Sequence, residues 1–233
     1  MNDTESFIGV LSRFARLPVT KDDVNAMLTD LTDIVTVLLD LAGAGVILAV
    51  DGQLRHVTAT PGPAVELERY QERFRSGPCC VAHETHETVS VTDVREHAVR
   101  WPGYSNAARR VGIAAVAAIP IAHAAERVGV LDLYAAEPRR WSGADIEAAQ
   151  VLADIAGGYL VNSAVQHRQQ QLTEQLQRAL DARIVIEQAK GILANQHSID
   201  MDQAFALIRN HARSHHVTVQ AVAKAIVELH LRL

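Results

Sequence analysis

Basic side chains in the last quarter of the chain have types and spacing that suit binding of a polyanion. Arg183 and Lys190 lie seven residues apart in one helical stretch, and Arg209 and Arg213 lie four apart in the next. Residues at these spacings share one face of a helix. Such a face can bind the phosphates of a nucleic acid, and the alternative is that it is simply solvated, as most charged faces are.

A glycine follows Lys190 directly, inside the same helical stretch. A glycine within a helix costs about 1 kcal/mol relative to alanine. The cost at Gly191 therefore favours the close approach of another backbone, which is either a neighbouring helix or a bound strand.

The chain contains two cysteines, Cys79 and Cys80, and they are adjacent. Neighbouring cysteines rarely form a disulfide with each other because the bond requires a specific geometry. A free cysteine most often behaves as a small buried hydrophobe. The alternative is redox or ligand sensing, which requires a lowered thiol pKa.

Motifs typical of enzymes are missing from the sequence. There is no Gly-x-Ser-x-Gly elbow, P-loop, dinucleotide fingerprint or His-Glu-x-x-His motif. His83, Glu84 and His86 lie close together, but the second histidine follows the first by three residues in a stretch that we expect to be a polar loop. We therefore expect neither catalytic activity nor a metal site.

The composition is that of an ordinary globular protein, with an uneven charge. Of the 233 residues, 48% are apolar and 21% are charged, and the net charge is −5. Residues 1–165 hold 14 Lys and Arg against 21 Asp and Glu, whereas residues 166–233 hold 8 against 6. This asymmetry permits a polyanion site in the C-terminal part. Because no secretory signal or membrane-length apolar stretch is found, we expect a cytoplasmic protein without membrane contact.

The first two thirds of the chain predict an α+β domain. Helical spacing predicts helices that begin near Thr20, at residue 64 and at residue 142, with Gly43 and Gly45 ending the first. Strands are predicted at residues 46–50, 54–59, 89–92, 115–122 and 128–134. Asp51-Gly52 is typical of a tight hairpin turn. The order of these elements predicts an antiparallel sheet with helices packed against it.

Helical spacing continues without a break beyond residue 160. Apolar residues recur every seven positions at Val165, Leu172, Ala179, Ile186 and Leu193. This pattern predicts a coiled-coil-like connector that forms a short dimeric contact. Two further helices are predicted after it, with Asp200 and Thr218 as their capping residues.

Residues 181–232 closely resemble an ANTAR domain. The resemblance rests on the run from Arg183 to Ala194, with Ala-Lys-Gly at its centre, and on the run from Ala204 to Arg213 with its Ala-Phe pair. It implies a three-helix module that binds paired RNA hairpins in bacterial regulators and prevents a terminator from forming. By position, it implies RNA contacts at Arg183, Lys190, Gly191, Ala204, Phe205, Arg209 and Arg213. Phe205 has an alternative role in the core, because apolar residues flank it.

Residues 20–162 resemble a GAF domain of the kind found upstream of ANTAR domains. The resemblance rests on Gly77-Pro78-Cys79, Asp93-Val94, the hairpin with Pro120 and Val128 to Leu131, and Trp141-Ser142. GAF domains bind varied small molecules, including cyclic nucleotides and tetrapyrroles. No Asn-Lys-Phe-Asp signature or bilin-type Cys-His pair is found, so the ligand is not identified. We expect a small molecule in a pocket between the sheet and the loops around residues 76–110.

These observations predict four segments. They are an N-terminal extension (1–19), a GAF-like sensor domain (20–162), a coiled-coil-like connector (163–180) and an ANTAR domain (181–233). The predicted fold is a GAF-like antiparallel sheet with flanking helices, followed by an all-α three-helix bundle.

The predicted function is signal-responsive regulation of transcription antitermination. The protein would sense a small molecule or partner through its GAF-like domain and bind paired RNA hairpins as a homodimer, with no DNA partner. One alternative is that the bundle binds a protein instead of RNA. Another is that Cys79 or Cys80 makes the GAF-like domain a redox sensor. The RNA hypothesis is favoured because the basic residues lie in the ANTAR-like module while the rest of the chain is acidic.

Overall fold

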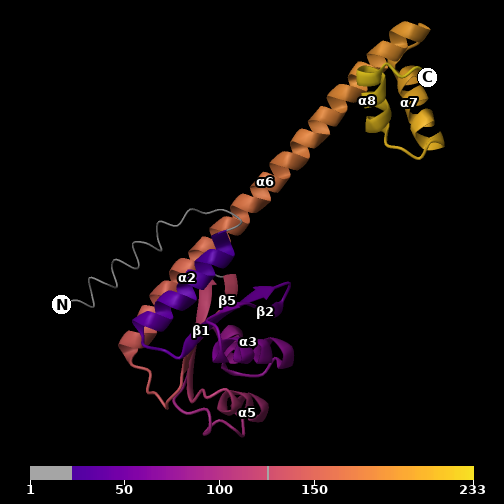
Figure 1. Ribbon diagram of the computed structural model, residues 1–233. Helices are drawn as coiled ribbons and strands as arrows, with labels where there is room; N and C mark the ends of the chain where they lie inside the picture. Colours follow the sequence, from indigo (N-terminus) through magenta and orange to yellow (C-terminus); the bar gives the residue numbers. More distant parts are fainter. Residues whose placement is uncertain (1–22, 125) are drawn as a thin grey trace. The chain divides into compact units, whose positions relative to one another are not determined.

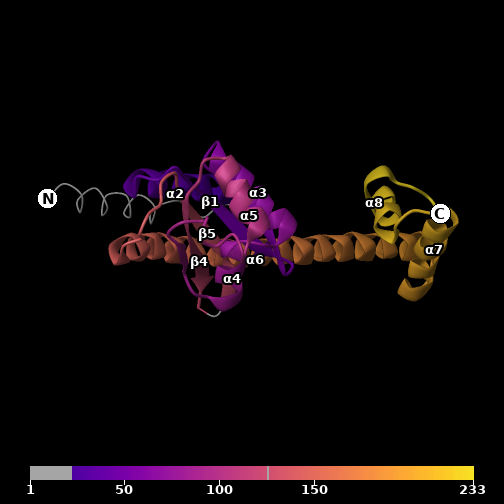
Figure 2. The ribbon, with the colours of Figure 1, turned by 90° about the horizontal axis from the view of Figure 1, so that it is seen from below.

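The computed structural model describes residues 23–124 and 126–233, and the chain divides into two compact units at residue 166 (Figures 1 and 2). The predicted start of the first helix, near Thr20, lies outside the described residues. Within them, no helix is both long and apolar enough to cross a membrane.

The first unit is built on an antiparallel sheet. Its strands in the described residues are β1 (Gly43–Val50), β2 (Gln53–Ala59), β3 (Val89–Val91), β4 (Ala115–His123) and β5 (Glu126–Ala135). They lie in the order β2-β1-β5-β4-β3, and each neighbouring pair is antiparallel. The predicted antiparallel sheet is confirmed.

Helices cover both faces of this sheet. They are α2 (Asp23–Leu38), α3 (Pro63–Phe74), α4 (Pro78–Thr85), α5 (Pro102–Arg110) and the beginning of α6 (Gly143–His197). The first and last of these share an apolar core with one face, where Leu131 and Leu133 are fully buried. Because side chains alternate along a strand, β5 turns Asp132 and Tyr134 to the opposite face, under α3, α4 and α5.

Local sequence signals explain the turns and caps of this unit. Asp51 and Gly52 have φ values of 50° and 72°, the positive values that a tight hairpin turn between β1 and β2 requires. At the start of α6, the Asp145 N–H donates to Ser142 Oγ at 3.1 Å, and the Ser142 N–H donates to the Asp145 carboxylate at 3.3 Å. These two hydrogen bonds form a capping box at the predicted start of this helix.

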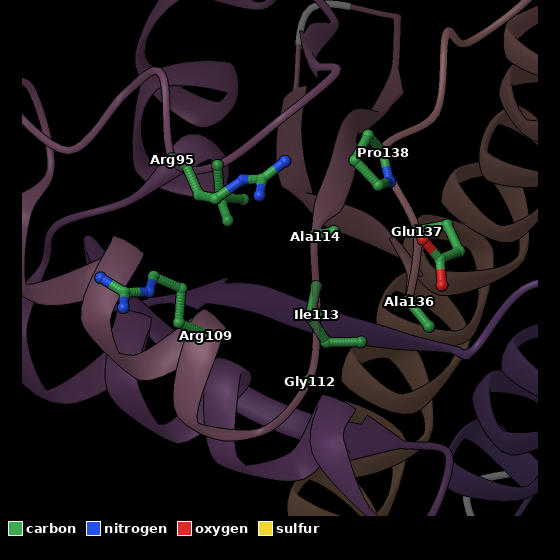
Figure 3. A pocket seen from close by; sticks show the side chains of 9 residues that line it. Arg95, Arg109, Gly112, Ile113, Ala114, Ala136, Glu137 and Pro138 are labelled. Atoms are coloured by element: carbon green, nitrogen blue, oxygen red, sulfur yellow. The ribbon is translucent and has the colours of Figure 1, made fainter.

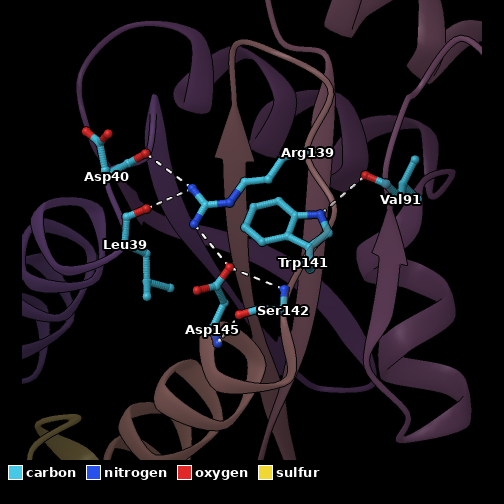
Figure 4. Close-up of polar contacts among 7 residues, drawn as sticks. All are labelled: Leu39, Asp40, Val91, Arg139, Trp141, Ser142 and Asp145. Atoms are coloured by element: carbon cyan, nitrogen blue, oxygen red, sulfur yellow. Dashed lines mark hydrogen bonds and ion pairs between the residues drawn. The ribbon is translucent and has the colours of Figure 1, made fainter.

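An arginine joins the end of α2 to the start of α6 (Figure 4). The Arg139 guanidinium donates to the carbonyl oxygens of Leu39 and Asp40 at 2.7 and 3.3 Å. Its other nitrogen donates to Asp145 at 3.1 Å, and the guanidinium lies 5.0 Å from the centre of the Trp141 ring. These contacts satisfy carbonyl groups that the end of α2 leaves without helical partners.

Two helices of the first unit were not predicted, and one boundary was wrong. Residues 83–85, expected to belong to a polar loop, lie in α4, and residues 102–110, for which no helix was predicted, form α5. Both helices have proline at their first position, where its missing N–H costs nothing, so these prolines start helices instead of ending them. Gly43 and Gly45 both lie in β1, so neither ends the preceding helix, which ends at Leu38.

The second unit is a small helical bundle. The end of α6 packs with α7 (Met201–Ser214) and α8 (Val219–Leu229) around a core that includes Ala189, Leu193, Ile208 and Ile226. Asp200 and Gln203 form a reciprocal capping box at α7, and the Thr218 hydroxyl accepts from the Ala221 N–H at 3.1 Å at α8. The predicted three-helix bundle is confirmed, with the end of α6 as its first helix. Since α6 is continuous, no break in the helix marks the predicted boundaries at residues 163 and 181.

Candidate RNA interface and buried sensor core

Lys190 and Phe205 meet where α6 and α7 pack together. The Lys190 ammonium lies 5.8 Å from the centre of the Phe205 ring, within the range of a cation–π contact. It also donates to both oxygens of Glu187 at 2.9 and 3.0 Å. The Lys190 side chain is only 15% exposed, whereas that of Glu187 is 50% exposed. Lys190 is thus held in place by its neighbours and is partly neutralised by a carboxylate.

Three arginines of the predicted set are exposed. Arg209 and Arg213 follow Phe205 along α7 at intervals of four residues, which places all three on one side of that helix. Arg183 lies seven residues, about two turns, before Lys190 on α6. The bundle therefore presents exposed guanidinium groups on two of its helices.

Gly191 lies on an open surface of α6. A Cβ atom added at this position would meet nothing within 4 Å. The hypothesis that a neighbouring helix requires the glycine is therefore wrong. The other hypothesis, close approach of a bound strand, is compatible with the empty space.

Ala204 and Phe205 have different surroundings, although they are adjacent. Ala204 is fully buried in the bundle core, so any contribution to an interface is made through packing. Phe205 is half-buried, with one face near Lys190. Near Arg209 and Arg213, the His211 and His215 rings stack with their centres 4.1 Å apart.

A buried polar network lies between α3, α4 and β5 in the first unit. The Gln71 amide donates to Asp132 at 3.1 Å and accepts from the Cys79 N–H at 3.0 Å. The Tyr134 hydroxyl donates to Glu68 at 3.0 Å. The side chains of Glu68, Gln71 and Asp132 are fully buried. This network ties the start of α4 to the central strand β5.

The two carboxyl groups of this network favour the protonated form. Burial raises the pKa of Asp132 to about 7. Burial, followed by the charge of Asp132, raises the pKa of Glu68 well above its usual value. One oxygen of each carboxyl group has no hydrogen-bond partner in the described residues. Two adjacent buried carboxyl groups cannot both be ionised without a large cost in free energy.

Sequence analysis missed this carboxyl pair. Glu68 lies on α3 between exposed charged residues and resembles a solvated position. Asp132 gave the better signal, because it interrupts an otherwise apolar strand. Gly45 makes the necessary room, since a Cβ at that position would collide with the Glu68 carboxyl group.

The two cysteines differ in their environments. Cys79 is fully buried, and burial raises the pKa of its thiol. Cys80 lies with its sulfur 3.9 Å from that of Cys79, and the hydrogen bond between them lowers the pKa of Cys80. Of the two thiols, Cys79 therefore holds its proton more tightly. Cys80 also lines a cavity of about 310 Å³ with Arg75, His83 and Arg127.

A second cavity of about 470 Å³ lies among the loops after β3 and β5. Arg95 and Arg109 line one side, Ile113 and Ala114 the middle, and Glu137 the other side (Figure 3). Arg95 is already paired with Asp93, to which its Nε donates at 2.9 Å. Each cavity has three lining residues within the range 76–110, around which a ligand pocket was predicted.

Family models match both parts of the chain. The model of the GAF domain matches residues 21–161, which is more than half of the chain, and the model of the ANTAR domain matches residues 174–227. The chain belongs to the GAF–ANTAR family. Both domains are regulatory and not catalytic in type, which agrees with the lack of enzyme motifs. None of the curated proteins compared with the chain matches it.

Solved GAF domains share the fold of the first unit. The GAF domain of a phosphoenolpyruvate-protein phosphotransferase from Coxiella burnetii is 14% identical, with a TM-score of 0.57, and the match covers 72% of this chain and 98% of that one. The corresponding domain from Acinetobacter is 10% identical, with a TM-score of 0.55 and coverage of 71% and 96%. The cyanobacteriochrome TePixJ GAF domain is 19% identical, with a TM-score of 0.53 and coverage of 65% and 95%. At such identities these similarities establish the fold alone.

Proposed function

We propose that this GAF–ANTAR protein is a signal-responsive RNA-binding regulator of transcription antitermination in the bacterial cytoplasm. In this proposal residues 20–162 sense a small molecule or partner, and residues 181–233 bind RNA hairpins. Residues 163–180 connect these two domains. The observations that carry it are the exposure of Arg183, Arg209 and Arg213 on the helices of the bundle and the Lys190–Phe205 contact between α6 and α7.

The side chains of this surface suit an RNA hairpin. Guanidinium groups bind phosphates and stack on unpaired bases, and a half-buried aromatic ring offers a further stacking face. The open surface at Gly191 lets a nucleic-acid backbone approach the helix closely. Ala204 supports the surface from within the core.

Binding as a dimer is supported by apolar side chains on α6. Leu172, Leu176, Leu180 and Ile184 recur every four residues and are 47–63% exposed. Burying one such side chain contributes about 1.5–3 kcal/mol, so pairing of this stretch with a second chain is favourable. Leu193, predicted to continue the seam, is buried in the bundle core instead. A dimer would present two bundles, and linkage of two sites raises avidity for two hairpins.

The proposal is tested by RNA binding of the full-length protein. A leader RNA with two hairpins is compared with a single-hairpin RNA, using Arg209→Ala and Lys190→Ala. Lys224→Ala is the matched control, since it removes the same charge from α8, where Lys224 contacts Glu228. We expect tighter binding of two hairpins, weakened by the first two changes and not by the control. Indifference to all three charges, together with capture of a specific protein partner, would favour the alternative that the bundle binds a protein.

A further inference from the structure

The two thiols of the GAF domain form an asymmetric pair. Cys79 and Cys80 are the second and third residues of α4, so both lie at the positive end of the helix dipole. Their sulfur atoms are 3.9 Å apart. Cys79 is completely enclosed, whereas Cys80 is 8% exposed and reaches the wall of a cavity. One thiol is therefore accessible to a small molecule, and the other lies directly behind it.

The cavity beside Cys80 is lined mainly by cationic and neutral polar groups. Arg75 and Arg127 contribute positive charge, and Glu84 contributes a negative charge. Burial, and then the charge of Arg127, lowers the pKa of His83, so this imidazole is neutral at pH 7 and can accept a proton. Arginine side chains and a helix N-terminus stabilise a thiolate. Burial of Cys80, the buried Asp132 carboxyl group and Glu84 oppose this effect, because each raises the pKa of the Cys80 thiol.

We propose that Cys80 is a redox-active thiol that a small hydroperoxide oxidises, with Cys79 as the resolving thiol. The Cys80 thiolate attacks one peroxide oxygen, an S–O bond forms, the O–O bond breaks, and the leaving oxygen takes a proton to become water or an alcohol. Cys79 then loses its proton and attacks the sulfur of the Cys80 sulfenic acid. An S–S bond forms, and the S–O bond breaks to release water. In total, two thiols are oxidised by two electrons and one peroxide is reduced.

Disulfide formation would change the start of α4. A disulfide is about 2.05 Å long, so the sulfur atoms must move together and the peptide that joins the two residues must distort. The Cys79 N–H now donates to Gln71, and Gln71 donates to Asp132 on β5. Oxidation would disrupt this connection between α4 and the sheet. The effect on RNA affinity rests on the proposed function, whereas the chemistry at Cys80 does not.

The test measures thiol chemistry in the full-length reduced protein treated with hydrogen peroxide or tert-butyl hydroperoxide. We expect wild-type protein to lose both thiols, to lose two hydrogen atoms in intact mass, and to yield one peptide that contains the disulfide. Cys79→Ala should stop at a Cys80 sulfenic acid that dimedone traps. In Cys80→Ser, the remaining thiol should react at least about tenfold more slowly, because Cys79 is buried and protonated.

A second measurement keeps the test independent of the buried Cys79 position. The rate of iodoacetamide alkylation of Cys80 is measured as a function of pH. The pH at which this rate reaches half of its maximum should lie below the corresponding midpoint for free cysteine. Arg127→Ala, a change of an exposed side chain, should raise this midpoint and slow oxidation. A midpoint at or above that of free cysteine, equal oxidation of Cys80→Ser and wild type, or a disulfide formed between chains would overturn the proposal.

RNA binding of the oxidised and reduced protein is measured separately. Oxidation at Cys80 with a several-fold change in RNA affinity supports both the thiol site and its role as the signal input. Oxidation without such a change supports the thiol site and overturns its role as that input. Oxidation in a protein that binds no RNA in either state would refute the proposed function and leave the thiol site intact.

Discussion

Replacing Gly191 by alanine separates the stability of the ANTAR bundle from its proposed RNA contact. Glycine inside a helix costs about 1 kcal/mol relative to alanine, because it loses more conformational freedom on folding. The new methyl group would meet nothing within 4 Å. Gly191→Ala should therefore stabilise the bundle by about 1 kcal/mol, which raises the Tm of a unit of this size by about 4–8 °C.

The same methyl group should weaken RNA binding, because it occupies the space through which we propose that a nucleic-acid backbone approaches. We expect about a tenfold loss in affinity, which corresponds to about 1.4 kcal/mol. The assay combines thermal unfolding followed by circular dichroism with a fluorescence titration of hairpin RNA on the same preparation. A contrasting variant is Gly157→Ala in the GAF part of α6, where the Cβ would lie 2.5 Å from the Ala122 carbonyl oxygen and should destabilise the domain.

The opposite signs of the two effects make this prediction informative. A variant that is more stable and binds RNA as well as wild type would refute the idea that RNA approaches Gly191. A less stable variant would refute the claim that a methyl group at position 191 points into open space. General damage to the bundle cannot produce the expected combination of higher stability and weaker binding.

Three further predictions concern the Glu187–Lys190 ion pair, the buried Asp132 carboxyl group and the hydrogen bonds of Arg139. Glu187→Gln should strengthen RNA binding several-fold in titrations, because it frees Lys190 from a carboxylate that competes with phosphate. Asp132 has a folded-state pKa of about 7 against 3.8 for the free group, so the folded state loses stability as the pH rises through this window, by a few kcal/mol. Asp132→Asn should therefore have a higher Tm than wild type at pH 8 and lose that advantage near pH 4. Equal profiles of Tm against pH for the two proteins would contradict a cost of ionising Asp132 in the folded state. Arg139→Ala should lower the free energy of unfolding by about 1–3 kcal/mol, because it leaves the carbonyl groups at the end of α2 and Asp145 without their donor; urea unfolding that is unchanged would contradict this.

Sequence signals that act over a few residues predicted the local structure well. The Asp51-Gly52 turn and the caps at Ser142, Asp200 and Thr218 each follow from one backbone requirement met by one side-chain type. The bundle was also predicted from local signals, because its apolar residues recur at helical spacing throughout. Its family resemblance also located the exposed arginines.

The features that sequence analysis missed depend on tertiary contacts. The helices that begin at Pro78 and Pro102 were not predicted, although proline at the first position of a helix is favourable. The Glu68–Asp132 pair is buried because α3 packs on β5 and Gly45 leaves room for a carboxyl group, and these residues are far apart in the sequence. The difference between Cys79 and Cys80 likewise arises from which side of α4 faces the core and which faces the cavity.

The salt dependence of RNA affinity tests the central claim most directly. The logarithm of the binding constant falls with the logarithm of salt concentration by about 0.7–0.9 for each phosphate contact. We predict a steep dependence for wild type and the same slope for Lys224→Ala. For Arg209→Ala the slope should be smaller by about 0.7–0.9 per chain, which corresponds to the loss of one phosphate contact. Equal slopes for all three proteins would contradict the account, because the exposed arginine of α7 would then make no contact with RNA.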